Sequence, residues 1–238
     1  MTGRAATVGG LAGVRAAIFD LNGTITDDEQ LQYEIYAELS RELLGVDLDR
    51  GSYFGELAGR SDHAIVERLL TRAGIAGTAA RELGPRLLRE RQQRYLRLVG
   101  SSPPVRPGTA ALLRRLAGEM PLAVATGALR EEAEQVLAAA GLLDCFDTVV
   151  TVEDVARGKP DPEGFQLALE RLNHGRPQED RLDPAEVVVF EDTPFGVQAA
   201  QAAGMRCVAA HLTAAVAADV VVAELGPELV GQQRVEAP

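Results

Sequence analysis

The chain of 238 residues contains no tryptophan, and aromatic residues make up only 4% of it. This scarcity favours a core of aliphatic side chains. Of its 24 cationic side chains, 23 belong to arginine, and Lys159 is the single lysine. Acidic residues number 35, so the formal net charge is 24 − 35 = −11. Nucleic acids and anionic membranes attract clustered positive charge, so we expect neither as a partner.

Cysteines and long apolar runs are scarce as well. Cys145 and Cys207 lack the spacing of metal ligands, and we interpret both as reduced thiols in the core of a cytoplasmic protein. No run approaches the ~20 apolar residues that cross a bilayer. The stretch after Arg4 is too rich in glycine for the apolar part of a secretory leader. We therefore expect a soluble protein located in the cytoplasm.

Short apolar runs alternate with helical patterns along most of the chain. Strands are predicted at residues 14–21, 122–126, 147–151, 187–191, 206–209 and 219–222, and helices at 107–117, 131–140, 162–172 and 194–203. With 46% apolar residues the chain can bury a sizeable core. This alternation predicts an α/β fold with a doubly wound, parallel, Rossmann-like sheet.

The alternation is interrupted once, directly after the first strand. Between residues 27 and 99 only helical patterns occur, at 29–44, 62–73 and 79–99. We predict a core domain of residues 1–25 and 104–238 and an inserted, all-helical cap domain of residues 26–103. Such an insertion lies above the carboxyl ends of the strands, where ligands bind in open α/β sheets. The arginines between 81 and 97 are expected to form a solvated helix face, paired with Glu82 and Glu90.

Polar side chains follow four of the predicted strands. Asp20 ends the first strand, Thr126 the second and the pair Glu191 and Asp192 the fourth, while Lys159 comes soon after the third. Carboxylates that converge at one sheet edge repel one another unless a cation joins them, and oxygen ligands of this kind suit Mg²⁺. Lys159 and Thr126 opposite such a metal ion complete a site for phosphate.

Four ordered motifs carry a resemblance to a known family. The segments DLNGT (20–24), LAVAT (122–126), GKPDP (158–162) and EDT (191–193) resemble the four motifs of the haloacid dehalogenase (HAD) superfamily, whose members are mostly Mg²⁺-dependent phosphatases. The resemblance runs from about Val14 to Leu229. The helical insertion matches the cap of the β-phosphoglucomutase-like branch. Together, the four motifs are far more specific than any one of them.

The resemblance implies a role for each residue that matches a motif. Asp20 is expected to attack phosphorus and form an aspartyl-phosphate. Asp20, the backbone carbonyl of Asn22 and Asp192 are expected to bind Mg²⁺, with Glu191 as a further ligand or as a support for the others. The resemblance places the phosphoryl group against Thr126 and the N–H of Gly127, with Lys159 bridging it to Asp20. Gly23 and Thr24 are also expected to bind the phosphate end of the substrate.

Asn22 departs from the family pattern. Phosphatases of the family usually have an aspartate there, which protonates the leaving oxygen and then activates water. Losing such a group typically costs ~10²–10⁴-fold in rate. Three explanations stay open: an engineered substitution, a natural residue with slow turnover or with a neighbour as the acid and base, and a protein that binds phosphorylated ligands without hydrolysing them. The nearby acids Asp27, Asp28 and Glu29 are more simply interpreted as solvated residues at a helix start.

The predicted cap narrows the choice of substrate. Arg60, in AGRSDH, fits a contact with a distal anionic group and a surface position equally well. A phosphosugar mutase is disfavoured, because the cap has Gln32 where that subgroup has histidine and only Arg60 as a cation in its loop. A phosphonate hydrolase needs a cap lysine, which is absent. A haloacid dehalogenase also lacks the second aspartate, but it needs no metal, and the Glu191 and Asp192 pair argues for one.

The sequence as a whole favours a Mg²⁺-dependent phosphomonoesterase, acting as a monomer or homodimer on a small phosphorylated metabolite. Its activity is expected to be weakened by Asn22. The alternatives are a catalytically silent protein that binds phosphorylated ligands, a metal-independent haloacid dehalogenase and, least favoured, a phosphosugar mutase.

Overall fold

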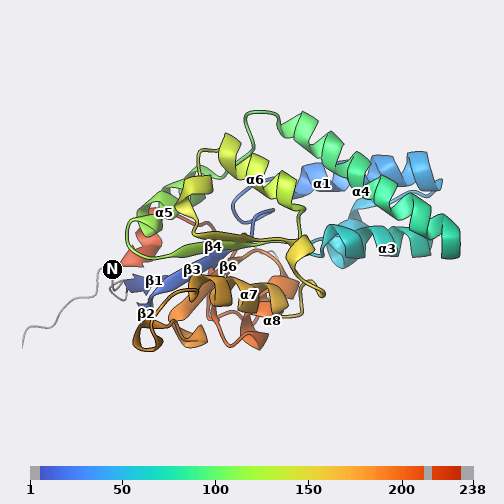
Figure 1. Cartoon of the computed structure of the whole chain (residues 1–238). Coiled ribbons are helices and arrows are strands. Elements are labelled where there is room, and N and C mark those ends of the chain that lie inside the picture. Colours follow the sequence, from blue (N-terminus) through green and yellow to red (C-terminus); the bar gives the residue numbers. More distant parts are fainter. Residues whose placement is uncertain (1–5, 212–215, 232–238) are drawn as a thin grey trace, which may run out of the picture.

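A computed structural model describes residues 6–211 and 216–231 of the chain. Residues 1–5, 212–215 and 232–238 lie outside the described residues, and with them Arg4 and small parts of the predicted core domain. Figure 1 shows a central sheet covered by helices on both faces and a group of further helices on one side of it.

The central sheet has six parallel strands, which confirms the predicted fold class. Their spatial order is β5 (Thr148–Val150), β4 (Leu122–Ala125), β3 (Ala16–Phe19), β6 (Val187–Glu191), β7 (Arg206–Ala210) and β8 (Val220–Val222). Ala17 of the central strand lies opposite Leu122 on one side and Val188 on the other. The strands that end at Asp20 and at Glu191 are therefore direct neighbours.

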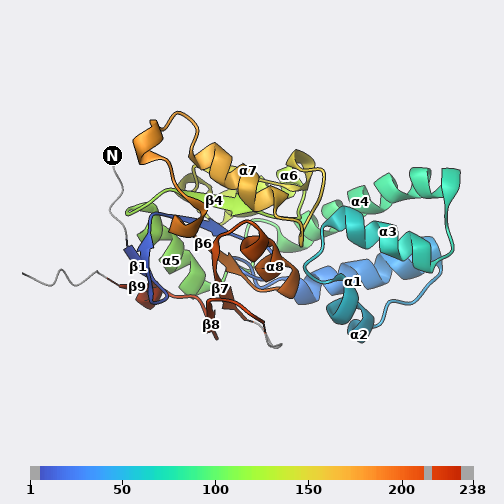
Figure 2. The ribbon, with the colours of Figure 1, turned by 90° about the horizontal axis from the view of Figure 1, so that it is seen from below.

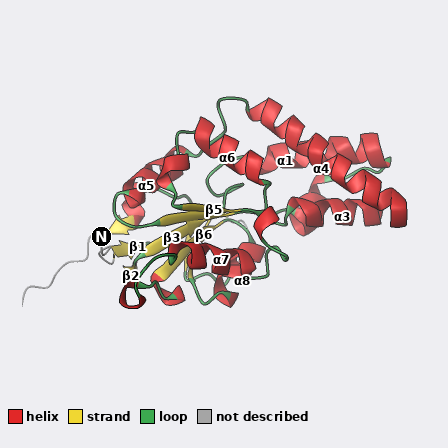
Figure 3. Cartoon of the chain, viewed as in Figure 1, coloured by secondary structure: helices red, strands yellow, loops and turns green. Residues whose placement is uncertain are grey.

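The central strands are apolar throughout because both faces of the sheet are buried. Ala17 and Phe19 face α5 (Pro107–Ala117) and α6 (Arg130–Ala139), whereas Ala16 and Ile18 face α7 (Glu163–Leu172) and α8 (Pro194–Ala202). Phe19 also stacks on Phe190 of β6, with ring centroids 4.3 Å apart. Figure 3 shows the sheet as a layer between these two pairs of helices.

The segment after β3 is helical, as predicted. It contains α1 (Glu29–Leu39), which continues into a π-helical turn (Ser40–Leu44), and then α3 (Asp62–Arg72) and α4 (Gly77–Val99). Between them lie the short α2 (Arg50–Ser52) and a second π-helical turn (Tyr53–Leu57), which the sequence patterns do not predict. These helices lie together beside the sheet in both views (Figures 1 and 2). The domain boundaries themselves stay a prediction.

A second, small sheet was not predicted. Residues 14–21 were expected to form one strand, but β2 (Leu11–Val14) pairs with β1 (Ala6–Val8) in an antiparallel hairpin, and β1 pairs with β9 (Val230–Gly231). Gly9 and Gly10 form the turn with positive φ angles of 56° and 83°. Glycine adopts such angles without steric strain, which allows the tight turn of this hairpin. Short 3₁₀ turns lie at Leu143–Cys145, Val152–Asp154, Gln178–Asp180, Pro184–Glu186 and Pro227–Leu229.

The arginines of α4 are not all solvated, and that prediction is wrong for Arg91. Arg86 does pair with Glu90 on the surface, at 2.7 Å. Arg91, in contrast, is 2% exposed and forms an ion pair with Glu132 of α6. Asp62 of α3 lies 3.3 Å from the same guanidinium nitrogen of Arg91. An arginine on the inner side of a helix is stable only when carboxylates neutralise it, and here they come from distant segments.

Two smaller predictions concern the thiols and the membrane. Cys145 and Cys207 are both free, and Cys207 is buried. None of the described helices is both long enough and apolar enough to cross a bilayer.

Candidate active site

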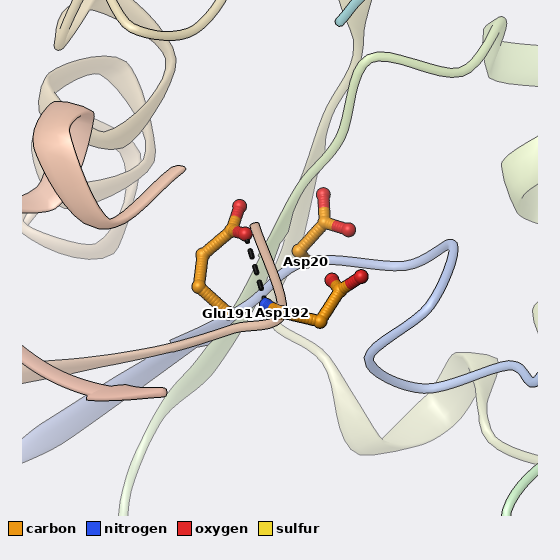
Figure 4. Close-up of side chains that lie close together, drawn as sticks. All are labelled: Asp20, Glu191 and Asp192. Atoms are coloured by element: carbon orange, nitrogen blue, oxygen red, sulfur yellow. Dashed lines mark hydrogen bonds between the residues drawn. The ribbon is translucent and has the colours of Figure 1, made fainter. Parts of the chain in front are cut away.

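Three carboxylates converge at the carboxyl edge of the parallel sheet. Asp20 follows β3, Glu191 ends β6 and Asp192 follows it, so the neighbouring strands bring them together. Each offers a carboxylate oxygen within 4.8 Å of the others. Figure 4 shows the side chains of Asp20, Glu191 and Asp192 gathered around one point. The sequence predicted this convergence.

Lys159 lies between two of these carboxylates. Its Nζ donates to Oδ1 of Asp20 at 2.5 Å and to Oε1 of Glu191. The ammonium group also lies 5.1 Å from the ring centroid of Phe165 in α7. Burial alone lowers the pKa of Lys159, but Asp20 and Glu191 outweigh burial and leave this pKa above its usual value. Lys159 is therefore a permanent cation in contact with the predicted nucleophile.

Glu191 is held rigidly by protein donors. Its Oε2 accepts from the backbone N–H of Asp192 (3.1 Å) and from the N–H and hydroxyl of Thr193 (3.1 and 3.0 Å). Gly196 of α8 lies so close that a Cβ there would stand 1.8 Å from Cδ of Glu191. Both oxygens of Glu191 thus have donors, one of them Lys159. Glu191 therefore helps to hold Lys159 in place, and its role as a metal ligand stays a prediction.

Asp20 and Asp192 each keep an oxygen that accepts no hydrogen bond from the described residues. Oδ1 of Asp20 is taken by Lys159 and Oδ1 of Asp192 by the hydroxyl of Thr24, at 2.7 Å, which leaves the two Oδ2 atoms. Burial raises the pKa of both carboxyls, and the charge of Glu191 raises them further. One lysine therefore does not compensate two buried carboxylates and a third that is half-buried. The all-oxygen donor set and the missing positive charge both fit Mg²⁺.

Thr126 and Gly127 lie where the sequence placed them, at the end of β4 and on the wall of the same cavity. Oγ1 of Thr126 accepts from the N–H of Ala128 at 3.1 Å, which orients its hydroxyl proton away from that contact. The N–H of Gly127 has no acceptor among the described residues. A Cβ on Gly127 would stand 3.0 Å from Cα of Ser61, so a larger residue there would push the loop after β4 and the segment around Ser61 slightly apart.

Gly23 and Thr24 support the site from behind and do not line the cavity. The hydroxyl of Thr24 donates to Asp192, and Thr24 is fully buried. Gly23 has a φ of 85°, and a Cβ there would stand 2.0 Å from Oδ2 of Asp192. The predicted contact of both residues with the phosphate end of the substrate stays a prediction. They position Asp192 through close packing and one hydrogen bond.

Asn22 and Asp28 form a pair that the sequence interpretation missed. Asp28 was expected to be solvated, but it is 1% exposed. Its Oδ2 accepts from Nδ2 of Asn22 at 2.7 Å and from the hydroxyl of Tyr95 at 2.5 Å. The backbone N–H of Gly23 and the hydroxyl of Thr26 donate to its Oδ1. The carboxylate is stable in this buried position because several donors surround it.

Glu29 was also expected to be solvated, and it lies instead on the wall of the cavity with Asp20 and Asn22. Its Oε1 accepts from the hydroxyl of Tyr53 at 2.9 Å. Burial raises the pKa of Glu29 to about 7, and the negative charges of Asp28 and Asp20 add to the effect. No local signal marks this position, because Tyr53 comes from a turn 24 residues further along the chain.

The cavity measures about 830 Å³, including its open mouth, and lies between the sheet edge and the helical segment. Its far wall contains Gln32, Tyr36, Asp62 and Arg91, the last already paired with acidic side chains. Arg60 also lines the cavity. Its guanidinium lies 4.2 Å from the ring centroid of Phe195, and its Nε donates to the carbonyl of Glu56 at 2.7 Å.

Comparisons with known proteins identify the family of this chain. A relative that is 34% identical over 218 residues is the validoxylamine A 7'-phosphate phosphatase of Streptomyces hygroscopicus subsp. limoneus, with 89% of this chain and 94% of the relative covered. The fructose-1-phosphate phosphatase YqaB of Escherichia coli is 32% identical, with 82% and 95% covered. The crystal structure of CbbY from Rhodobacter sphaeroides in complex with phosphate superposes with a TM-score of 0.72 and 26% identity, over 88% of this chain and 93% of that one. The sequence model of the haloacid dehalogenase-like hydrolases matches residues 14–204, and this chain therefore belongs to that family.

Proposed function

We propose that the chain is a Mg²⁺-dependent phosphomonoesterase that acts on a small phosphorylated metabolite such as a sugar phosphate. The observation that carries the proposal is the contact of Lys159 with Asp20 beside the free carboxylate oxygen of Asp192. A nucleophile, a fixed cation and an oxygen donor set for a metal thus share one cavity. Two relatives named as phosphatases of small phosphorylated compounds support the same class of substrate.

The residues divide the chemistry among them. Asp20 attacks phosphorus through one of its carboxylate oxygens and forms an aspartyl-phosphate, while Lys159 offsets the repulsion between this carboxylate and the anionic phosphoryl group. Thr126 and the N–H of Gly127 hold phosphoryl oxygens. Asp20, the carbonyl of Asn22 and Asp192 bind Mg²⁺, which when bound supplies positive charge to the transferring phosphoryl group.

The helical segment acts as a cap over this chemistry. Glu29, Gln32 and Tyr36 of α1, together with Asp62 of α3, line the side of the cavity opposite the sheet. A wall of this kind contacts the alcohol part of a phosphate ester and keeps bulk water away from the aspartyl-phosphate. The cap residues therefore choose the substrate, whereas the sheet edge performs the transfer.

The test is phosphate release from a panel of esters: fructose 1-phosphate, glycerol 3-phosphate, glucose 1-phosphate and p-nitrophenyl phosphate. The chain is expected to release phosphate from at least one ester with Mg²⁺ and to lose the activity in EDTA. Asp20→Asn is expected to abolish it, whereas Asp47→Asn, at an exposed surface carboxylate, should leave it unchanged. Binding of these esters without phosphate release would establish the silent binding protein instead. Halide release from a haloacid that persists in EDTA would establish the dehalogenase.

A further inference from the structure

The proposed reaction needs a proton donor for the leaving oxygen, and the residue two positions after the nucleophile cannot supply one. Asn22 has a neutral side-chain amide, which holds its protons at any useful pH. An alcohol leaving group departs slowly without a proton, and the water that later attacks the aspartyl-phosphate must lose one. Three acids follow in the chain, Asp27, Asp28 and Glu29, and the structure separates them.

Asp27 and Asp28 are excluded by their surroundings. Asp27 is exposed, pairs with Arg106 at 2.6 Å and does not line the cavity. Asp28 lies behind Asn22, also outside the cavity wall. Its two oxygens accept from the side chains of Asn22, Thr26, Tyr95 and Gln32 and from the N–H of Gly23. A carboxylate surrounded in this way fixes the amide of Asn22, but it has no free path to a substrate.

Glu29 differs from both. It lines the cavity that contains Asp20, Asn22 and Lys159, and it begins α1 on the cap side of that cavity. Oε1 accepts from the hydroxyl of Tyr53, and Oε2 accepts no hydrogen bond from the described residues. One oxygen is thus anchored and the other is free to meet a ligand.

The charge environment of Glu29 suits proton transfer in both directions. The groups that act on it are Tyr53 from the turn after α2, Arg91 from α4, and the carboxylates of Asp28 and Asp20. Burial is the largest influence and, with the two carboxylates, brings the pKa of Glu29 to about 7 despite the opposing effects of Tyr53 and Arg91. An acid and base works best when its pKa lies near the working pH.

We propose that Glu29 is the catalytic acid and base that replaces the missing aspartate at position 22. The inference rests on the proposed phosphatase function. In the first step an oxygen of Asp20 attacks phosphorus, the bond between phosphorus and the ester oxygen breaks, and that oxygen takes the proton of the Glu29 carboxyl. In the second step the Glu29 carboxylate takes a proton from a water whose oxygen attacks phosphorus. The bond to Asp20 breaks, inorganic phosphate leaves, and Glu29 is protonated again.

The leaving group provides the test. Glu29→Gln keeps the shape of the side chain and removes its ability to transfer a proton. Asp27→Asn is the matched control, because it removes the negative charge of an exposed side chain only two residues from Glu29. On the alkyl phosphate that the chain hydrolyses fastest, Glu29→Gln is expected to lower kcat by ~10²–10⁴-fold. The leaving group of p-nitrophenyl phosphate departs as a phenolate and needs no proton. On this substrate the Glu29→Gln variant is expected to release the first equivalent of nitrophenolate as fast as the unaltered chain does. Turnover should then stall, with the mass of phosphorylated Asp20 detected by intact-mass spectrometry.

Other outcomes overturn the inference in distinguishable ways. An unchanged kcat of Glu29→Gln on the alkyl phosphate excludes Glu29 as the acid. An equal loss on both substrates without phosphoenzyme shows a structural role and overturns the proposal. Tyr53→Phe keeps the carboxyl, removes its hydrogen bond and is expected to shift the acid limb of the pH profile upward; an unshifted profile counts against Glu29. Absence of phosphate release by the unaltered chain on every ester overturns the phosphatase function itself.

Discussion

The side-chain amide of Asn22 donates a 2.7 Å hydrogen bond to Oδ2 of Asp28. The negative charge of this loop therefore lies one layer behind the nucleophile, in a buried position, and not beside it at residue 22. Asp28 also accepts a hydrogen bond from Tyr95 of α4, so the same carboxylate connects the loop after β3 with the helical segment. Any substitution of Asn22 therefore also changes the surroundings of the Asp28 carboxylate.

Exchange of this pair is the first prediction. Asn22→Asp alone would bring two carboxylates to the 2.7 Å separation of the present hydrogen bond, so it is expected to destabilise the fold and to accelerate turnover little. In the double variant, Asn22→Asp with Asp28→Asn, the amide at position 28 donates the hydrogen bond to the carboxylate at position 22. This exchange places an acid beside Asp20. The two changes should couple by about 1–3 kcal/mol in urea unfolding, and the double variant should hydrolyse esters faster than the single one. A single variant as stable as the unaltered chain would contradict this.

Lys159→Arg is the second prediction. The compact ammonium contacts Asp20 and Glu191 at once, and the planar fork of a guanidinium does not reproduce these two contacts of a point charge. The expected loss is ~10²–10³-fold in kcat, the size of a lost donor to a transition state. Arg41→Lys, at an exposed surface pair, is the control and should retain full activity. Steady-state kinetics check the effect, and circular dichroism checks the fold; an active Lys159→Arg enzyme would remove Lys159 from the phosphoryl site.

Removal of one carboxylate should separate metal binding from stability. Burial and two neighbouring carboxylates raise the pKa of Asp192, so its ionised form destabilises the metal-free protein. Asp192→Asn is expected to melt in EDTA at or above the Tm of the unaltered chain. Added Mg²⁺ should raise the Tm of the unaltered chain only, because the variant lacks one ligand. Thermal melts with and without Mg²⁺ measure both effects, and equal Mg²⁺ responses would place the metal elsewhere.

The buried ion pair between Arg91 and Glu132 joins α4 of the helical segment to α6, which packs on the sheet. Glu132→Gln leaves the guanidinium with Asp62 as its remaining carboxylate neighbour and should cost about 3 kcal/mol in the free energy of unfolding. Glu90→Gln removes a carboxylate from the exposed pair with Arg86 and should cost at most about 1 kcal/mol. Urea titrations compare the two variants. Equal losses would show that Arg91 is better solvated than the structure indicates.

Stability should depend on pH through Glu29. Its folded-state pKa of about 7 lies above the ordinary value of 4.5, so the folded state binds the proton more tightly than the unfolded state does. Stability of the metal-free chain is therefore expected to fall as pH rises from about 4.5 to about 7, by up to ~3 kcal/mol from this group. Glu29→Gln removes this pH dependence. In EDTA, the free energy of unfolding of this variant should therefore exceed that of the unaltered chain by an amount that grows with pH. A constant difference between pH 5 and pH 8 would show that Glu29 has an ordinary pKa.

The amino-acid sequence by itself determined the parallel sheet and the convergence at its edge. Continuous apolar runs predict buried parallel strands, and the carboxyl ends of such strands meet at one edge. Asp20, Thr126 and Asp192 follow three such strands directly and were therefore expected at one edge, whereas Lys159 reaches it from the loop after β5. The long helices followed from their apolar periodicity, which is local as well.

Only the tertiary structure decided which charged residues are buried. Acids at the start of a helix look the same in sequence whether water or protein surrounds them, and Asp27, Asp28 and Glu29 have three different surroundings. Asp28 meets Tyr95 across 67 residues of chain, and Arg91 meets Glu132 across 41. The strands β1 and β9 pair across an even longer stretch of chain. Burial and charge compensation depend on such distant contacts, and these arise from packing that no local pattern of residues contains.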